Sequence, residues 1–347
     1  MKALLRVGRG PREVEVREVD YPKLKPGWVI IAVKACGICG SDVHMFLSEW
    51  PMGPSGDGST SFIFGHEFSG EVVEVGEGVK TFAKGDRVVC MPKMSCGKCY
   101  YCRSGLSHLC PNEPLLNGGM AEYVAVPEAN LLKLPENVSY EEGALVEPLA
   151  VSYAAVYKTS QILPGQSAVI VGPGPIGLLT LMCVKLANPQ LAIITGTSED
   201  KMRLEIAEKI GADVTIDVTK KDVVKVVEEL TNKLGVDVVY ECAGAGLLDQ
   251  AIDLLKAGGE LVAIGHPTTK TQIKLSPQGY MRAQFKQLKI LGHIIYDWKS
   301  FYLALQLLNY RKLDVKPLIT HKVPLADALR GFELAMRKEA VKVLIIP

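Results

Sequence analysis

A run of β-branched residues that leads straight into a glycine-rich turn constrains the fold of this chain most. In the segment SAVIVGPGPIG, Gly172, Gly174 and Gly177 follow the run, and an apolar helix is expected to begin at Pro175 and Ile176. A lone GxGxxG motif is weak, but it is strong at the first strand-to-helix turn of an alternating series. Glycines allow close approach of the backbone, and the helix N-terminus presents free N–H groups to a pyrophosphate. The motif therefore predicts a dinucleotide site.

The part of the chain that contains this motif alternates strand-like and helix-like runs. LAIITG, DVVYECAG and GELVAIG have the character of buried strands, whereas DKMRLEIAEKI and LLDQAIDLLK have helical periodicity. Successive βα units of this kind form a parallel sheet with helices on both faces. The pattern predicts an α/β fold with a doubly wound Rossmann domain over residues 146–291.

The rest of the chain has a different period. Residues 1–145 contain short β-rich runs such as EVEVREV, VIIAVKA and GEVVEVG, separated by Gly, Pro and Asp turns. This pattern is typical of a small β-barrel or sandwich. Residues 292–347 contain one expected helix and end in the apolar run VKVLIIP. We expect this last part to return to the first domain.

Composition narrows the class of partner. The chain has 347 residues, 48% of them apolar, which favours two domains. Its 39 basic and 38 acidic residues leave a net charge of +1, so electrostatics do not favour nucleic acid or an anionic membrane. A small-molecule ligand is expected. Nine cysteines, no cleavable leader and no unbroken apolar stretch predict a cytoplasmic protein with reduced thiols.

Four of the cysteines lie within fifteen residues, in the segment CGKCYYCRSGLSHLC. Their spacing lets one tetrahedral metal ion bind all four thiolates of Cys96, Cys99, Cys102 and Cys110. A polar loop of this kind rarely holds an ordered structure without a metal or disulfides. We predict a structural zinc lobe over residues 96–110, closed to substrate.

A second set of ligand-type side chains is dispersed along the chain. Thiolate, imidazole and carboxylate are ligands that suit zinc. The candidates are Cys39 and His44 in CGICGSDVH, His66 and Glu67 in FGHE, and Glu147 in VEPLA. If folding brings three or four of them together, the site keeps a position for water or substrate, and open sites of this kind are catalytic.

The second strand of the Rossmann pattern lacks the acidic residue that usually binds the adenosine ribose through its 2′-hydroxyl. The position carries Gly196 instead. The absence of a carboxylate removes repulsion of a 2′-phosphate. Two hydroxyls and a nearby cation would bind such a phosphate: Thr197, Ser198, and Lys201 or Arg203. These residues favour the phosphorylated cofactor. The alternative is that Glu199 or Asp200 reaches the ribose.

Taken together, the motifs resemble those of the zinc-dependent medium-chain alcohol dehydrogenase superfamily, in the branch of sorbitol and threonine dehydrogenases. CGICGSDVH, GHEFSGEVVEVGEGV, the four-cysteine lobe, GGMAEYV, EPLAV, VIVGPGPIG and KPLITHKVPL occur in that order. The resemblance covers nearly the whole chain. It implies a GroES-like β-rich catalytic domain, a Rossmann domain and a homo-oligomer, either a dimer or a tetramer.

The resemblance also implies roles for single residues and two zinc ions per chain, one catalytic and one structural. Cys39, His66 and Glu67 match catalytic-zinc ligands, and Glu147 is either a further ligand or holds the zinc-bound water. Ser41 matches a hydroxyl that relays the substrate proton, and His44 matches an imidazole that passes it to solvent. An imidazole suits that task near neutral pH.

One departure limits the substrate. Sorbitol dehydrogenases have an Arg followed by a Tyr that help to hold the sugar hydroxyls, whereas GHIIYDW offers Ile295 and Tyr296. The change favours a shorter or less polar alcohol, or an amino alcohol.

The predicted function is therefore hydride transfer between a secondary alcohol or polyol and NAD(P), with NADP favoured, to give the ketone. An L-threonine-type dehydrogenase is the alternative among enzymes. A non-catalytic binding protein with a zinc ribbon is the alternative from another class.

Overall fold

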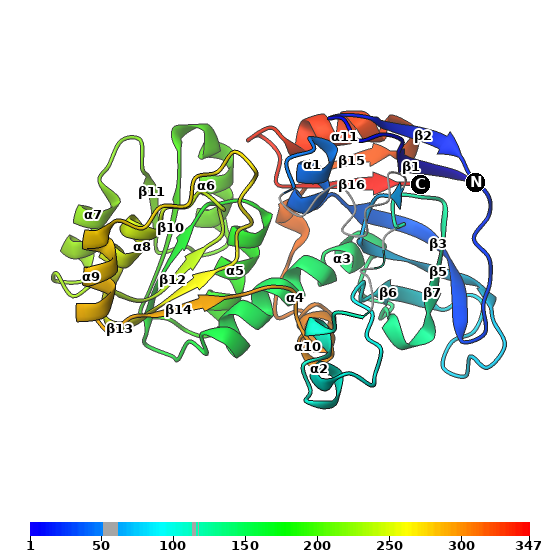
Figure 1. Ribbon diagram of the computed structural model, residues 1–347, viewed down its shortest axis with the longest axis horizontal. Helices are drawn as coiled ribbons and strands as arrows, with labels where there is room; N and C mark the ends of the chain where they lie inside the picture. Colours follow the sequence, from blue (N-terminus) through cyan, green and yellow to red (C-terminus); the bar gives the residue numbers. More distant parts are fainter. Residues whose placement is uncertain (51–61, 113–115, 117) are drawn as a thin grey trace. The chain divides into compact units, whose positions relative to one another are not determined.

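The computed structural model describes residues 1–50, 62–112, 116 and 118–347, and these divide into two compact units (Figure 1). The first unit combines Met1–Ala150 with Tyr296–Pro347, so both ends of the chain belong to it. The second unit is Val151–Ile295. Across the described ranges, no helix has the length and apolar character needed to cross a membrane.

The second unit is built on a six-stranded parallel sheet with the order β11-β10-β9-β12-β13-β14. The first strand, Ser167–Val171, is buried at every residue, as expected for a parallel sheet covered on both faces. The strands are β9 Ser167–Val171, β10 Leu191–Gly196, β11 Val214–Asp217, β12 Val236–Glu241, β13 Leu255–Ala263 and β14 Lys289–Gly292. In chain order this is the 3-2-1-4-5-6 arrangement of a dinucleotide-binding fold.

Helices connect these strands. Side-chain caps begin two of them: Asp222 accepts from Val224 and Lys225, and Ser276 accepts from Gly279. The helices are α5 Pro175–Leu186, α6 Lys201–Lys209, α7 Val223–Leu230, α8 Leu248–Leu254 and α9 Pro277–Phe285, with a π-helical turn at Ala155–Thr159.

The first unit is β-rich. A three-stranded sheet has the order β2-β1-β4, and a seven-stranded sheet has the order β15-β16-β3-β5-β6-β8, with β7 also paired to β3. The strands are β1 Lys2–Arg6, β2 Val14–Glu18, β3 Trp28–Gly37, β4 Phe62–Ile63, β5 Glu67–Val75, β6 Arg87–Cys90, β7 Tyr123–Pro127, β8 Leu131–Lys133, β15 Ile319–Pro324 and β16 Lys342–Ile346.

Short helices complete this unit. They are α1 Gly40–Phe46, α2 Tyr100–Arg103, α3 Tyr140–Ala144, the start of α4 Val146–Ala154, α10 Trp298–Asn309 and α11 Ala328–Ala335. Four single turns of 3-10 helix lie at Ser107–Leu109, Glu128–Asn130, Lys316–Leu318 and Leu325–Asp327, and a fifth at Ser198–Asp200 belongs to the second unit. The β-rich unit and the parallel sheet confirm the predicted class of fold.

The last strand of the chain lies in the middle of the first unit. β16 pairs antiparallel with β3, with Leu344 opposite Gly37 and Ile345 opposite Cys36 (Figure 1). Its residues Val343, Leu344 and Ile345 are buried. Residues more than 300 positions apart are thereby neighbours in one sheet, next to the helix α1 that follows β3.

Candidate active site

The four cysteines of the lobe converge. Cys99 Sγ lies 3.5 Å from Cys102 Sγ and 3.9 Å from Cys110 Sγ, and Cys96 Sγ lies 4.0 Å from Cys102 Sγ. Tetrahedral zinc with Zn–S bonds of about 2.3 Å requires sulfurs roughly 3.8 Å apart. The Asn112 side chain donates to Cys96 Sγ and lowers the pKa of this thiol to about 6, which favours the thiolate. The donor set and its spacing fit a closed zinc site.

The second cluster is assembled from three places in the first unit. Cys39 is the N-cap of α1, His66 follows the turn at Gly65, and Glu67 begins β5. One ligand atom from each lies within 4.8 Å of the others, and His66 and Glu67 are buried. At Gly37 a Cβ atom would lie 2.1 Å from a Glu67 oxygen, so the glycine makes room for this carboxylate. A thiolate, an imidazole and a carboxylate gathered in this way fit zinc with one position open.

Asp42 supports two members of this cluster and was not singled out from the sequence. Its carboxylate is fully buried and accepts the backbone N–H of Cys39 at 2.9 Å. Its other oxygen lies 3.6 Å from His66 Nδ1. A carboxylate that accepts the Nδ1 proton orients a metal-binding imidazole and leaves Nε2 for the metal. At this distance the Asp42 oxygen is near His66 Nδ1 without a hydrogen bond between them. The signal was present in the sequence, as the acidic residue within GSDVH.

Lys342 is the second supporting residue that sequence reasoning missed. Its Nζ lies 2.7 and 2.9 Å from the two oxygens of Glu67 and donates to the carbonyl of Ile38 at 3.1 Å. Burial lowers the pKa of Lys342, but Glu67 raises it more, so the net shift is upward and the amine stays charged. A single lysine in the apolar run VKVLII was the sequence signal for a buried ion pair.

Glu147 lies near this cluster but outside the three-residue set. It is 7% exposed, and the Tyr296 hydroxyl donates to its Oε1 at 3.0 Å. Burial raises the pKa of Glu147 to about 7, and both His66 and Glu67 interact with it electrostatically. Glu147 is therefore close enough to interact electrostatically with His66 and Glu67, but its carboxylate accepts a hydrogen bond from Tyr296.

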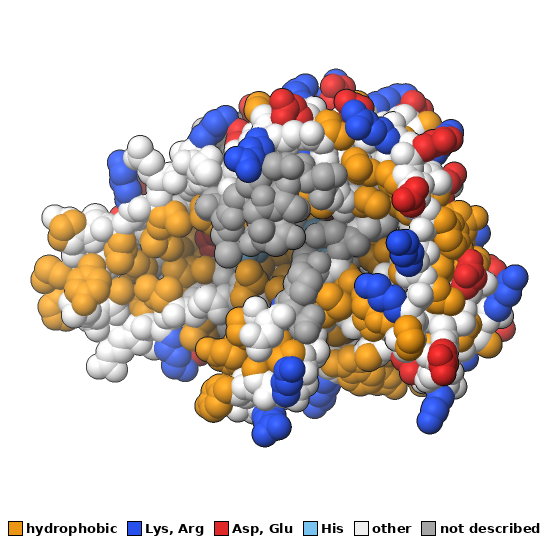
Figure 2. Space-filling view, turned by 45° about the vertical axis from the view of Figure 1, so that its right-hand side comes forward, with side chains coloured by type: hydrophobic (Ala, Val, Ile, Leu, Met, Phe, Trp, Pro, Cys, Tyr) orange, Lys and Arg blue, Asp and Glu red, His pale blue; other side chains and the backbone are white. Residues whose placement is uncertain are grey.

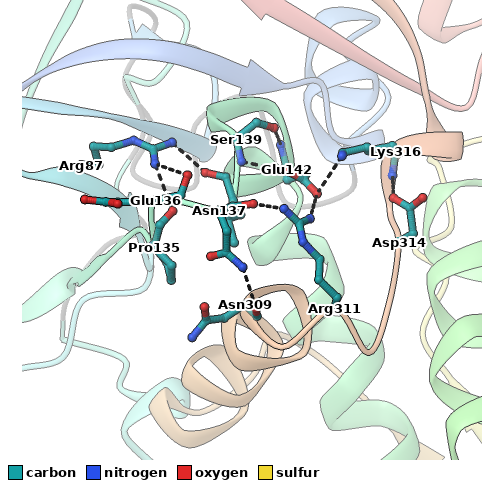
Figure 3. A network of polar contacts seen from close by, with 11 residues as sticks. Arg87, Pro135, Glu136, Asn137, Ser139, Glu142, Asn309, Arg311, Asp314 and Lys316 are labelled. Atoms are coloured by element: carbon teal, nitrogen blue, oxygen red, sulfur yellow. Dashed lines mark hydrogen bonds and ion pairs between the residues drawn. The ribbon is translucent and has the colours of Figure 1, made fainter.

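A polar network anchors the helix pair that carries Glu147 (Figure 3). Glu142 on α3 accepts from the Ser139 backbone N–H at 2.8 Å and from Arg311 Nη1 at 2.6 Å. Arg311 also donates to the Asn137 carbonyl, and the Asn137 side chain donates to the Asn309 carbonyl at the end of α10. The segment 309–311 is thus tied to Asn137 and to Glu142, which lies five residues before Glu147.

Ser41 and His44 both lie on α1, three residues apart and therefore on the same face of the helix. Both are half-buried. Burial lowers the pKa of His44, which keeps its imidazole neutral near pH 7. The ring stacks on Trp50 with centroids 6.2 Å apart. A neutral imidazole at this place can accept a proton.

The glycine motif has the geometry of an anion-binding turn. Gly172 follows β9 with φ of +94°, Gly174 is the N-cap of α5, and Pro175 is its first residue. A Cβ at Gly177 would lie 1.9 Å from the Gly172 carbonyl, so helix and turn require glycine there. At Gly174 a Cβ would meet nothing within 4 Å, which leaves open space at the helix N-terminus.

The residues expected to bind a 2′-phosphate follow β10. Gly196 has no room for a side chain, because a Cβ there would lie 2.8 Å from Pro173. Three of the four candidates donate to a carboxylate: Thr197 Oγ1 to Asp200 at 2.8 Å, Arg203 Nη1 to Asp200 at 3.3 Å, and Ser198 Oγ to Asp217 at 2.6 Å. Asp200, one alternative ribose partner, is 2% exposed. A phosphate would have to compete with these bonds.

Comparisons with known proteins identify the family of this chain. Residues 25–136 match the family model of the alcohol dehydrogenase GroES-like domain, and residues 175–310 match that of zinc-binding dehydrogenases. The chain is 37% identical to sorbitol dehydrogenase of Halalkalibacterium halodurans, over 100% of this chain and 99% of the relative. It is 36% identical to L-threonine 3-dehydrogenase of Pyrococcus horikoshii, over 96% and 94%.

A solved structure is similar over its whole length. The zinc-binding dehydrogenase of Sinorhizobium meliloti 1021 bound to NADP has a TM-score of 0.89 at 33% identity, covering 100% of this chain and 99% of that one. Both units of the present fold are therefore found in a protein that binds a nicotinamide cofactor.

Proposed function

Because this chain belongs to the zinc-dependent medium-chain alcohol dehydrogenase superfamily, in the branch of sorbitol and threonine dehydrogenases, we propose that Cys39, His66 and Glu67 form its catalytic zinc site. The protein is an NAD(P)-dependent alcohol or polyol dehydrogenase. The convergence of three buried or half-buried zinc-type ligands carries the proposal. The second zinc of the chain is held by the four cysteines of the lobe and has a structural role.

The chemistry divides between the bound groups and the chain. When bound, zinc supplies Lewis acidity toward the substrate hydroxyl, and the nicotinamide ring supplies the hydride acceptor. Asp42 and Lys342 orient the ligand side chains and balance their charge. Glu147 is a buried carboxylate beside the cluster. It would either join the ligand set or accept a hydrogen bond from the water that occupies the open position before substrate binds.

Proton release is the task of α1. Ser41 takes the hydroxyl proton of the substrate, and His44 passes it to solvent. Their shared helix face and the lowered pKa of His44 support this relay, because a neutral imidazole can accept the proton near neutral pH. His44 is half-buried, and so retains access to water.

The substrate is a secondary alcohol or polyol that is shorter or less polar than a sugar alcohol. Ile295 stands where sorbitol dehydrogenases have an arginine, and Tyr296 is engaged with Glu147. L-Threonine is the second candidate, supported by 36% identity to the P. horikoshii enzyme. Its carboxylate would need an unpaired cation near the cluster. Within the described ranges, the buried amine beside the cluster is that of Lys342, which is paired with Glu67.

The cofactor binds at the turn Gly172–Gly177, with its pyrophosphate at the N-terminus of α5. A preference for NADP over NAD rests on the bare Gly196 and on Thr197, Ser198 and Arg203 that follow it. It is also supported by the NADP-bound S. meliloti structure. When a 2′-phosphate binds, we expect Arg203 to exchange its hydrogen bond to Asp200 for one to the phosphate.

The protein acts as a homo-oligomer through the edge of its parallel sheet. β14 is an edge strand, and apolar side chains on it and on α9 are exposed: Tyr280, Met281, Phe285 and Ile290. Figure 2 shows hydrophobic side chains grouped on the left-hand part of the molecule. An unpaired edge with an apolar border favours pairing with a second copy. Ile290→Lys should shift the chain to monomer in light scattering.

A cytoplasmic location follows from the cysteines. All nine lie in described segments and none is in a disulfide, which suits a reducing compartment.

One experiment tests the central proposal. Purified protein is analysed for zinc and for cofactor reduction with polyols, short secondary alcohols and L-threonine, each with NAD and NADP. Two zinc ions per chain and reduction with an alcohol are expected. A single zinc would contradict the open site, and turnover of L-threonine alone would replace the substrate class. Faster reduction of NAD would contradict the proposed preference for NADP.

A further inference from the structure

We propose that Tyr296 is a positioning residue that holds the Glu147 carboxylate out of the metal-ligand set, so that the fourth coordination position remains open for substrate. The inference rests on the proposed zinc site at Cys39, His66 and Glu67 and deepens it. It decides between the two roles that the sequence left open for Glu147.

The hydrogen bond itself is the first observation. Tyr296 Oη donates to Glu147 Oε1 at 3.0 Å, and both residues are buried, at 1% and 7% exposure. Burial removes competition from water for this hydrogen bond. Glu147 is thereby drawn toward Tyr296, and it is absent from the group of ligand atoms that lie within 4.8 Å of one another.

The tyrosine ring is held firmly. It stacks on Phe301 with centroids 5.6 Å apart and an interplanar angle of 9°. The preceding residue, Ile295, has φ of +58°, a left-handed conformation that a β-branched side chain adopts only when its surroundings impose it. Strain of this kind persists where the structure fixes a functional geometry. The Tyr296 ring is therefore constrained by its stacking on Phe301, and the backbone before it by the conformation of Ile295.

Glu147 has reason to move if it is released. His66 and Glu67 are close enough to interact with it electrostatically, and a buried carboxylate without a partner is strongly unfavourable. A cation held by Cys39, His66 and Glu67 would compensate the charge of a released Glu147 carboxylate. Four protein ligands would then close the site, and closed zinc sites are structural rather than catalytic.

Tyr296→Phe removes the hydroxyl and keeps the stacked ring. The matched control is Tyr240→Phe, because Tyr240 is also fully buried and its hydroxyl also bonds a side chain, Ser160, at 2.7 Å in the second unit. Cobalt(II) replaces zinc in both variants and in the wild type. Imidazole is titrated against the visible cobalt bands, which report the binding of an added ligand at the open position.

In Tyr296→Phe the imidazole affinity should fall by about ten- to a hundredfold, as expected for loss of a hydrogen bond to a charged group. Cobalt affinity should rise, because a fourth protein ligand is added. Tyr240→Phe should match the wild type in both measurements. In the double variant Tyr296→Phe with Glu147→Gln, imidazole affinity should return toward the wild-type value, since an amide is a poor zinc ligand.

Unchanged imidazole affinity in Tyr296→Phe would overturn the proposal, as would the same loss in the double variant. Either result leaves the zinc site intact. Failure of the proposed function is distinct: the wild type would then bind cobalt at the four-cysteine lobe alone, and Cys39→Ser would leave its spectrum unchanged.

Discussion

The two groups of metal-ligand-type side chains in the first unit differ in how the chain builds them. The lobe collects Cys96, Cys99, Cys102 and Cys110 from fifteen consecutive residues, and three of the four are half-exposed. The other cluster takes Cys39, His66 and Glu67 from α1, a turn and β5, and its Glu67 is held by Lys342 from the last strand. The first needs only local geometry, whereas the second needs the whole unit.

This difference matches a structural role for the four-cysteine lobe and a catalytic role for the other cluster. Four thiolates satisfy zinc completely and leave no open position. Three mixed ligands leave one position open, but the thiolate and the buried carboxylate must then be neutralised, and the imidazole must be oriented, by other residues. Around the second cluster, Lys342 pairs with Glu67 and Asp42 lies against Cys39 and His66. Tyr296 donates to the neighbouring Glu147. In the lobe, the Asn112 side chain donates to Cys96 Sγ.

Removing a ligand from the open cluster should have the largest effect. Cys39→Ser is expected to lower turnover by roughly a thousandfold, because zinc supplies several kcal/mol of charge stabilisation. It should also lose one zinc per chain while the lobe keeps the other. Metal analysis and steady-state kinetics check both. Full turnover with one zinc lost would mean that the catalytic site lies elsewhere.

The second largest effect is expected for Lys342→Met, which should lower the free energy of unfolding. It leaves the Glu67 carboxylate buried without its partner, and breaking a buried ion pair from one side costs roughly 3–5 kcal/mol. Lys342→Arg keeps the charge and should lose less. Urea unfolding of the three proteins measures the difference. Equal losses in both variants would show that packing, rather than charge, is the contribution of Lys342.

Cys102→Ser tests the four-cysteine lobe. It should release the zinc of the lobe and unfold this loop locally, with little change in turnover. Sites without shared partners couple by less than about 0.5 kcal/mol, so turnover should stay within about twofold. Limited proteolysis and kinetics of the folded protein test this. A loss as large as that of Cys39→Ser would show that the two clusters are coupled.

The smallest effect is expected at the network of Figure 3. Burial raises the pKa of Glu142, but bonds from Ser139 and Arg311 lower it more, and the net shift is downward. The stabilisation is therefore present above the ordinary glutamate pKa of about 4.3 and is lost as pH falls through the lowered pKa. Because Arg311 is half-exposed, Arg311→Met should cost roughly 1 kcal/mol at pH 7.

The control for this prediction is Lys322→Met. Lys322 pairs with the neighbouring Glu141 in a more exposed setting, so its loss should be smaller. Urea unfolding at pH 7 and below the glutamate pKa provides the comparison. A cost of Arg311→Met that persists in acid would show that the Arg311–Glu142 charge pair is not its source.

Much of the architecture was accessible before the structure. The alternation of period predicted the parallel sheet, and the glycine motif predicted the turn after β9, because both depend on local backbone preferences. The cysteine spacing predicted the group that converges in the lobe. Asp42 was overlooked although it lies beside Cys39, and Lys342 was overlooked because it is distant in sequence from Glu67.

By itself the sequence determined what is local: the strand and helix periods, the glycine turn and the four-thiolate lobe. Only the tertiary structure decided which dispersed side chains meet, since strand pairing carries Lys342 to Glu67 and places Tyr296 on Glu147. The physical reason is that a buried charge must find a partner wherever the fold provides one, and that choice is made across the whole unit.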